Sequence, residues 1–386
     1  LLLISLPLTD ILYEKCIVII ISSNLRTCAD IFITNFAISS KSITFAFDMT
    51  SHASRRTAHP GRSSSLYTVM RYEKKPIDTS EQVKKLCDRG LNIGDEKLAS
   101  QYLYNISYYR LRAYTYPFQN NGEGANHEFL RKDISFQDVI DLYCFDRRLR
   151  SLIFNAIEKI EVALRTRIAL TYSVDENDAF WFLNHKLYFQ HDKFIALTRN
   201  EIIDDKPVVG DLMKEVKRSN EEFIAHYYQK YSEPAFPPAW MTLEVVSMGT
   251  LSKLFFALDK NNPSSKTICR DLGLYNVDIL KNWMHGLSSL RNTCAHHSRV
   301  WNRRFTIALK FPYRTNYPFL SKQEAATIRD NKLFAYLSVI LYLQQIISPD
   351  SSFRKSLLTL LDKSPKLVVL KDMGFPEKWR EYSLWK

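Results

Sequence analysis

Residues 283–303 (WMHGLSSLRNTCAHHSRVWNR) gather side chains that could act on a phosphodiester: imidazoles, amides and guanidinium groups. If the stretch is helical, at about 100° per residue, its apolar and polar residues fall on opposite faces. The apolar sector consists of Leu280, Trp283, Leu287, Leu290 and Cys294. The other face carries His285, Ser288, Ser289, Asn292, His296 and Arg299, all within roughly 60° of His285. A plain solvated face would more often carry Lys and Glu, so this face is a candidate site.

Arg291 lies beside the apolar sector, next to Leu290 and one turn after Leu287. Its aliphatic stem should therefore be partly covered, and its guanidinium needs an anion or another acceptor. Phosphate is the obvious candidate. Imidazole exchanges protons near neutral pH, so the stretch combines a phosphate ligand with groups suited to acid–base work.

The spacing Arg291-Asn292-x-x-x-His296 resembles the R-x4-6-H motif of HEPN ribonucleases. The longer string RNTCAHHSRVWNR is similar to the form found in the Abi-like (AbiD/AbiF) abortive-infection proteins. Further segments that fit this family are Arg89-Gly90-Leu91, residues 106–111 (ISYYRL), 116–118 (YPF), 145–150 (FDRRLR) through Glu161 and Arg165, 238–252 with Glu244, and 373–385 with Trp379 and Trp385. The resemblance covers about residues 73–386.

This resemblance implies an all-α fold, with a multi-helix HEPN-type bundle core at about residues 136–312 and additional N- and C-terminal helices. It also implies a metal-independent endoribonuclease of an abortive-infection phage-defence or toxin–antitoxin system. No metal or cofactor is expected. The implied partners are the RNA substrate, a second copy of the chain, and a cognate antitoxin or noncoding RNA.

The family motif implies catalytic roles for Arg291, His296 and Asn292. His296 would take a proton from the ribose 2′-hydroxyl or give one to the departing 5′-oxygen. Arg291 would stabilise the charge on a phosphorane-like transition state. DNA would then survive, and the RNA products would carry 2′,3′-cyclic phosphate ends.

Helix geometry raises a difficulty for this pair. Arg291 and His296 are five residues apart, roughly 140° round a straight helix, whereas Asn292 and His296 share a face. Either the helix loosens near Ala295, or the Arg291 side chain swings round, or Arg291 serves the histidine of a partner chain. A homodimer is expected because HEPN nucleases usually build one site from two motifs, and this chain has one such match.

Six further residues are candidates for binding RNA or supporting the catalytic pair: His285, His297, Arg299, Glu244, Glu161 and Arg165. Glu161 and Arg165 are spaced as an i,i+4 ion pair, and helix stabilisation is favoured over a role in positioning Arg291. For Glu244 a structural carboxylate fits at least as well as a catalytic one. In the alternative without catalysis, His296 is a capping or surface imidazole and Arg291 belongs to a buried ion pair.

A noncatalytic RNA-binding or partner-binding HEPN module, such as an antitoxin, is the rival function. The intact Arg291, Asn292 and His296 favour the nuclease. A DNA-binding regulator is a weaker rival because no helix-turn-helix is evident. The motifs of phosphate-binding loops, serine hydrolases and zinc metalloproteases are absent from the sequence.

Composition fits a basic helical protein. Only 10 Gly, against 23 Phe and 21 Tyr, favours long helices with aromatic packing. The formal charge is +12, and residues 1–69 contribute little of it, so the excess lies with the motif and nucleic acid is the leading anionic partner. The six Cys form no C-x-x-C pair, which indicates neither a disulfide framework nor a zinc site and fits a reducing cytoplasm.

Residues 1–69 are predicted to be a poorly structured leader, either translated upstream of a native start such as Met70 or a genuine extension. No apolar run there reaches a membrane span, and no secretory signal pattern is present.

Residues 70–386 are predicted to be the Abi-like domain. Caps at Asp78, Asp95 and Ser135 predict helices, the last reaching about Tyr172. Residues 173–234 look irregular, and helices follow at 240–255 and 333–347. Aromatic and basic residues alternate at 108–112, where packed tyrosines are favoured over a nucleic-acid surface.

Overall fold

Helix α6 (Phe136–Asp175) is the longest element of the computed structural model, which describes residues 71–203 and 206–386. Its start is fixed by a capping box, in which the Ser135 side chain accepts the Asp138 N–H and the Asp138 carboxylate accepts the Ser135 N–H. Apolar residues then recur every three or four positions and are buried along its length. Forty residues give a helix about 60 Å long. The predicted leader of residues 1–69 lies outside the described residues.

The other elements are α3 (Thr79–Asp88), α4 (Glu96–Ile106), α5 (Tyr108–Thr115), η1 (Tyr116–Phe118), η2 (Trp181–Leu183), η3 (His185–Leu187), α7 (His191–Thr198), β1 (Asn200–Ile203), β2 (Lys206–Val209), α8 (Asp211–Arg218), α9 (Glu222–Lys230), α10 (Ala239–Val245), α11 (Met248–Ala257), α12 (Pro263–Asp271), α13 (Val277–Ala295), α14 (Lys322–Ala326), α15 (Leu333–Ile347), α16 (Phe353–Asp362), η4 (Leu370–Met373) and η5 (Trp379–Glu381). Strands β1 and β2 pair antiparallel as a small hairpin. The all-α prediction is therefore confirmed, with the hairpin as an addition.

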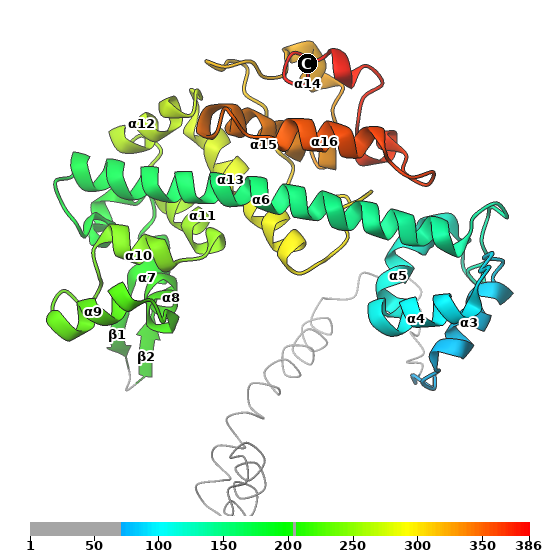
Figure 1. The fold of residues 1–386 in the computed structure, drawn as a ribbon. Coiled ribbons are helices and arrows are strands. Elements are labelled where there is room, and N and C mark those ends of the chain that lie inside the picture. The colour runs from blue at the N-terminus through cyan, green and yellow to red at the C-terminus, as the bar shows by residue number, and fades with distance from the viewer. Residues whose placement is uncertain (1–70, 204–205) are drawn as a thin grey trace, which may run out of the picture. The chain divides into compact units, whose positions relative to one another are not determined.

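Helix α6 is the centre of the packing, as Figure 1 shows. Helices α5, α10, α11, α12, α13, α15 and α16 all contact it. Helix α15 is apolar along most of its length and nearly all of it is buried, as expected for a packing helix. Its Gln344 side chain donates to the Ala156 carbonyl of α6 at 2.7 Å. At the chain end, Trp385 stacks on Phe334 of α15 with ring centroids 4.8 Å apart, so this tryptophan is a C-terminal anchor.

Most predicted boundaries are close to the observed ones. Asp78 and Asp95 cap α3 and α4, and α15 has the predicted bounds. The prediction for residues 173–234 was wrong: α7, α8, α9 and the hairpin lie there. These helices have only eight or nine residues, so their apolar periodicity is too short to stand out. The predicted helix at 240–255 is two helices, because the backbone is extended at Val246 and Ser247 caps α11.

No described helix is both long and apolar enough to cross a membrane.

Candidate active site on helix α13

Helix α13 buries the predicted apolar stripe. Leu280, Trp283, Leu287, Leu290 and Cys294 are all buried. The Trp283 indole donates to the Lys310 carbonyl at 2.7 Å, which satisfies its one polar group in the core. Gly286 allows α13 to approach its neighbours closely, since a Cβ there would lie 2.5 Å from the Leu309 Cδ2 atom. Burial of this stripe fixes the rotation of α13 about its axis, and the polar face is thereby turned away from the core.

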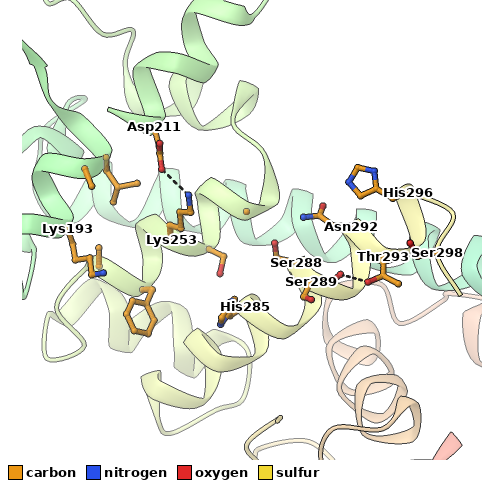
Figure 2. Close-up of a pocket in the computed structure, with 16 residues that line it drawn as sticks. Lys193, Asp211, Lys253, His285, Ser288, Ser289, Asn292, Thr293, His296 and Ser298 are labelled. Carbon is orange, nitrogen blue, oxygen red and sulfur yellow. Dashed lines mark hydrogen bonds and ion pairs between the residues drawn. The ribbon is translucent and has the colours of Figure 1, made fainter. Parts of the chain in front are cut away.

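That polar face forms one wall of a cavity of about 810 Å³, here called the histidine pocket. Figure 2 shows His285, Ser288, Ser289, Asn292 and His296 following one another along α13. The remaining lining residues are Thr293, Ser298, Lys193, Ala196, Leu197, Asp211, Gly249, Ser252, Lys253, Phe256 and Ala257. The opposite wall therefore comes from α7, α8 and α11. The wheel correctly grouped the polar residues of α13, but the helices facing them were not foreseen.

Two lysines, two histidines and one carboxylate line the histidine pocket. Lys253 of α11 is paired with Asp211 of α8 at 2.9 Å, and Lys193 of α7 adds a second ammonium. His285 and His296 are exposed side chains, so both can reach a ligand in the cavity. Because Asp211 pairs with Lys253, Lys193 is the lysine of this lining for which no carboxylate partner occurs among the described ion pairs.

Arg291 lies on the side of α13 that faces α6. Its Nε atom is 3.5 Å from the Glu161 carboxylate, and its guanidinium lies 5.7 Å from the centre of the Phe154 ring. Glu161 also accepts from Arg165 at 2.9 Å, and Arg165 donates to the Val246 carbonyl at 2.8 Å. Glu161 and Arg165 therefore form the predicted ion pair. In addition, Glu161 holds the Nε atom of Arg291.

One guanidinium nitrogen of Arg291 points toward the pocket rim. Its Nη1 atom is 3.4 Å from the Asn292 side-chain oxygen, and Asn292 lines the histidine pocket. The Arg291 side chain is 31% exposed. Among the described residues that line the pocket, Arg291 itself does not occur. Within one chain, Asn292 and His296 share the cavity, while Arg291 stands beside it.

The helix stays regular through the motif. His296 is the C-cap, and its N–H donates to the Asn292 carbonyl at 2.9 Å. The helix has therefore not loosened near Ala295, and Arg291 has not swung into the pocket. Two of the three arrangements considered from the sequence therefore do not occur. The third, in which Arg291 serves the histidine of a partner chain, stays a prediction.

The helical wheel was wrong about Arg299, because α13 ends at Ala295 and the wheel does not apply beyond it. His297 takes a left-handed backbone conformation (φ 56°), which turns the chain away from the helix axis. Arg299 instead lines a second cavity of about 710 Å³, here called the arginine pocket. Its lining residues are Ser107, Tyr109, Arg110, Arg112, Ala113, Tyr114, Tyr116, His296, His297, Ser298, Arg299 and Arg303. His296 and Ser298 line both pockets.

Asp146 of α6 holds the turn that follows His296. Its carboxylate accepts the backbone N–H of Val300 at 3.1 Å and of Trp301 at 2.6 Å. The Tyr114 hydroxyl donates to it at 2.6 Å, and Arg150 forms a buried ion pair with it. Burial raises the pKa of Asp146, and Arg150 and the other donors oppose that shift. Asp146 lies in the segment FDRRLR, where no spacing in the sequence indicates its role; its wholly buried carboxylate beside Arg150 positions the turn after His296.

Glu244, a candidate site residue, and Cys294, expected in the apolar sector, both lie away from the candidate chemistry. Glu244 is exposed on α10 and is absent from the described lining of both pockets. Cys294 is in the core, and burial raises its pKa to about 12. Within residues 71–203 and 206–386, no three His, Cys, Asp or Glu side chains are grouped to hold a metal ion.

Comparison with known proteins gives one family. No curated protein and no solved structure matches the chain. The family model described as "Abi-like protein" matches residues 101–302, a narrower range than the resemblance over residues 73–386. The match begins in α4, includes α6 and the whole motif helix α13, and ends just after the turn held by Asp146. Because it spans just over half of the 386 residues, the chain belongs to the Abi-like protein family.

Proposed function

We propose that this protein is a metal-independent endoribonuclease of the HEPN type, acting in an abortive-infection or toxin–antitoxin system. Family membership points to abortive infection in general terms. The observation that carries the nuclease activity is the grouping of His296, Asn292 and His285 on one wall of a cavity, with Arg291 fixed at its rim.

His296 is the proposed acid–base group. Its side chain is exposed and lines both pockets, so a ribose–phosphate chain lying across either pocket can reach the ring. The imidazole takes the proton of the 2′-hydroxyl as the oxygen attacks the phosphorus, or gives one to the departing 5′-oxygen. Asn292, one helical turn earlier, can donate from its amide to a phosphate oxygen in the same cavity.

Arg291 is the proposed electrostatic group. Glu161 holds its Nε side, and its Nη1 atom lies beside Asn292. A guanidinium fixed in this way stabilises charge on the phosphate without being reorganised during the reaction. Because Arg291 lies outside the cavity of its own chain, we propose that in a homodimer it stabilises the phosphate whose cleavage the His296 of the second copy catalyses.

The test is cleavage of a 5′-labelled single-stranded RNA by the purified full chain, with chelator present throughout. Wild type should cut the RNA, leave DNA of the same sequence intact, and produce 2′,3′-cyclic phosphate ends. His296→Ala should lower the rate by about 10²–10⁴-fold, as expected for loss of a general acid–base group. Arg291→Ala should lower it by about 10²–10³-fold.

Folding of each variant is checked by circular dichroism, and His226→Ala serves as a histidine control outside both pockets. If chelator abolishes wild-type cleavage, or folded His296→Ala cuts as fast as wild type, the mechanism is wrong. RNA that is bound but never cut would support the noncatalytic binding module instead.

A further inference from the structure

The arginine pocket contains arginines to which the proposed catalytic mechanism gives no role. Four arginines line it, two from α5 and two from the segment after α13: Arg110, Arg112, Arg299 and Arg303. His296 and His297 add two imidazoles. Among the described residues that line this cavity, none is Asp or Glu.

Within the described residues, these arginines are held by neutral groups and not by carboxylates in direct ion pairs. Arg110 donates to the His297 carbonyl at 2.8 Å, Arg303 to the Arg299 carbonyl at 3.3 Å, and Arg299 to the Ala113 carbonyl. Arg112 lies 3.2 Å from the His127 ring nitrogen. Across the part of the chain that the structure describes, none of the four forms an ion pair. Guanidinium groups held by neutral acceptors keep their full charge for an anionic ligand.

Two tyrosine rings stand at the same pocket. Tyr109 is 81% exposed and Tyr116 is 46% exposed. Tyr108 behaves differently, because its hydroxyl accepts from Arg89 at 2.6 Å and its ring packs against the core. The prediction of packed tyrosines at 108–112 is therefore right for Tyr108 and wrong for Tyr109. An exposed aromatic ring beside basic groups is a platform on which an unpaired base can stack.

The position of the arginine pocket links it to the proposed reaction. It shares His296 and Ser298 with the histidine pocket, so His296 stands between the two cavities. A strand bound along the arginines would therefore come within reach of that imidazole. At about 710 Å³, the cavity is in the size range of pockets that hold small-molecule ligands, roughly 300–1,000 Å³.

We infer that the arginine pocket is the docking subsite for a single-stranded RNA segment that flanks the scissile phosphate. The inference rests on the proposed function for its substrate, and it adds the class of substrate and the residues that recognise it. The arginines bind phosphates, and Tyr109 stacks on a base. Stacking requires an unpaired base, so duplex RNA is excluded from the subsite. Because the pocket contacts phosphates and base faces, uncut single-stranded DNA also binds there and competes.

The test separates binding from cleavage. The probe is a fluorescein-labelled 2′-O-methyl RNA oligomer of mixed sequence, which cannot be cut because its 2′-oxygen is blocked. Its binding to the full chain is followed by fluorescence anisotropy at several salt concentrations. Tyr109→Ala should weaken binding roughly 5- to 150-fold, the effect of losing one stacked base, and Tyr109→Phe should bind like wild type. Arg112→Gln should weaken binding and reduce the salt slope by about one.

Matched controls lie outside the pocket. Tyr313 is 93% exposed elsewhere on the surface, and Arg304 is an exposed neighbour of Arg303 that does not line the cavity. Tyr313→Ala and Arg304→Gln should each bind the probe within about twofold of wild type. Single-stranded DNA should displace the probe, whereas a duplex of the same sequence should do so at least tenfold less effectively.

The outcomes distinguish this inference from the nuclease proposal. If RNA is never cut but Tyr109→Ala weakens binding and Tyr109→Phe does not, the subsite stands and the catalytic proposal fails. If RNA is cut but Tyr109→Ala binds like wild type, the subsite is wrong and the catalytic proposal stands. Equal displacement by the duplex, or by an oligo-glutamate peptide of the same charge, would also overturn the subsite.

Discussion

Replacing Glu161 by Gln tests whether a buried carboxylate positions Arg291. Glu161 is 2.9 Å from Arg165 and 3.5 Å from Arg291. The Glu161 and Arg165 side chains are 9% and 10% exposed, so removing the carboxylate leaves the Arg165 charge buried without its partner. Loss of one member of a buried pair costs about 3–5 kcal/mol. Glutamine keeps one oxygen acceptor, so we expect about 3 kcal/mol, measured by urea denaturation.

The interaction of Glu161 with Arg291 contributes less to the stability than its interaction with Arg165, and it can be measured separately. The Arg291 side chain is 31% exposed, and its Nε lies at the longer distance from Glu161. Solvent screening therefore reduces that interaction to about 0.5–1 kcal/mol. A double-mutant cycle of Glu161→Gln with Arg291→Ala should return this value, and the cycle with Arg165→Ala should return a larger one.

The functional consequence follows from the same geometry. Without Glu161, Arg291 keeps its charge but loses the contact that directs it, so the cleavage rate should fall while His296 stays in place. Glu161→Asp, which keeps the charge on a shorter stem, should retain more activity than Glu161→Gln. A folded Glu161→Gln protein with wild-type stability and wild-type cleavage would refute this account of Arg291.

Three further predictions concern the turn after the motif, the buried thiol and the assembly. Asp146→Asn should destabilise the fold by about 3–5 kcal/mol, because Arg150 loses its buried partner, and hydrogen exchange should show faster exchange of the Val300 and Trp301 amides. Cys294, with its pKa raised to about 12, should resist iodoacetamide at pH 7 in the native protein and react only after denaturation, since about one molecule in 10⁵ carries the thiolate. Light scattering should show a homodimer, and cleavage should fall faster than linearly on dilution; a monomer whose rate is linear in concentration contradicts the shared site.

The sequence predicted those features that depend on local periodicity. The apolar stripe of α13, the cap and length of α6, and the bounds of α15 all follow from residues within one element. The Glu161–Arg165 pair was found for the same reason, since i,i+4 spacing places both on one helix surface. Nothing beyond a single helix was needed for these predictions.

Contacts between distant segments could not be predicted in this way. Asp146 reaches Val300 and Trp301 across more than 150 residues of sequence, and no spacing rule connects them. The same holds for Arg110, which donates to the His297 carbonyl from α5. The error over Arg299 has a local cause, because the wheel assumed a helix where His297 turns the backbone to φ 56°.

Arg291 and His296 lie on different sides of α13, and the packing of the helix explains why. The apolar stripe directs Asn292 and His296 into one cavity, and the five-residue spacing then turns Arg291 toward Glu161 on α6. Asp146 and Arg110 fix the segment just after His296, which keeps the imidazole between the two pockets. A single chain thus has a basic cavity, the arginine pocket, next to the exposed His296, and Arg291, the proposed phosphate-binding group, stands at the rim of the histidine pocket. If, as proposed, Arg291 works with the His296 of a second chain, activity depends on assembly. For a protein whose proposed activity destroys RNA, dependence on assembly is also a means of control.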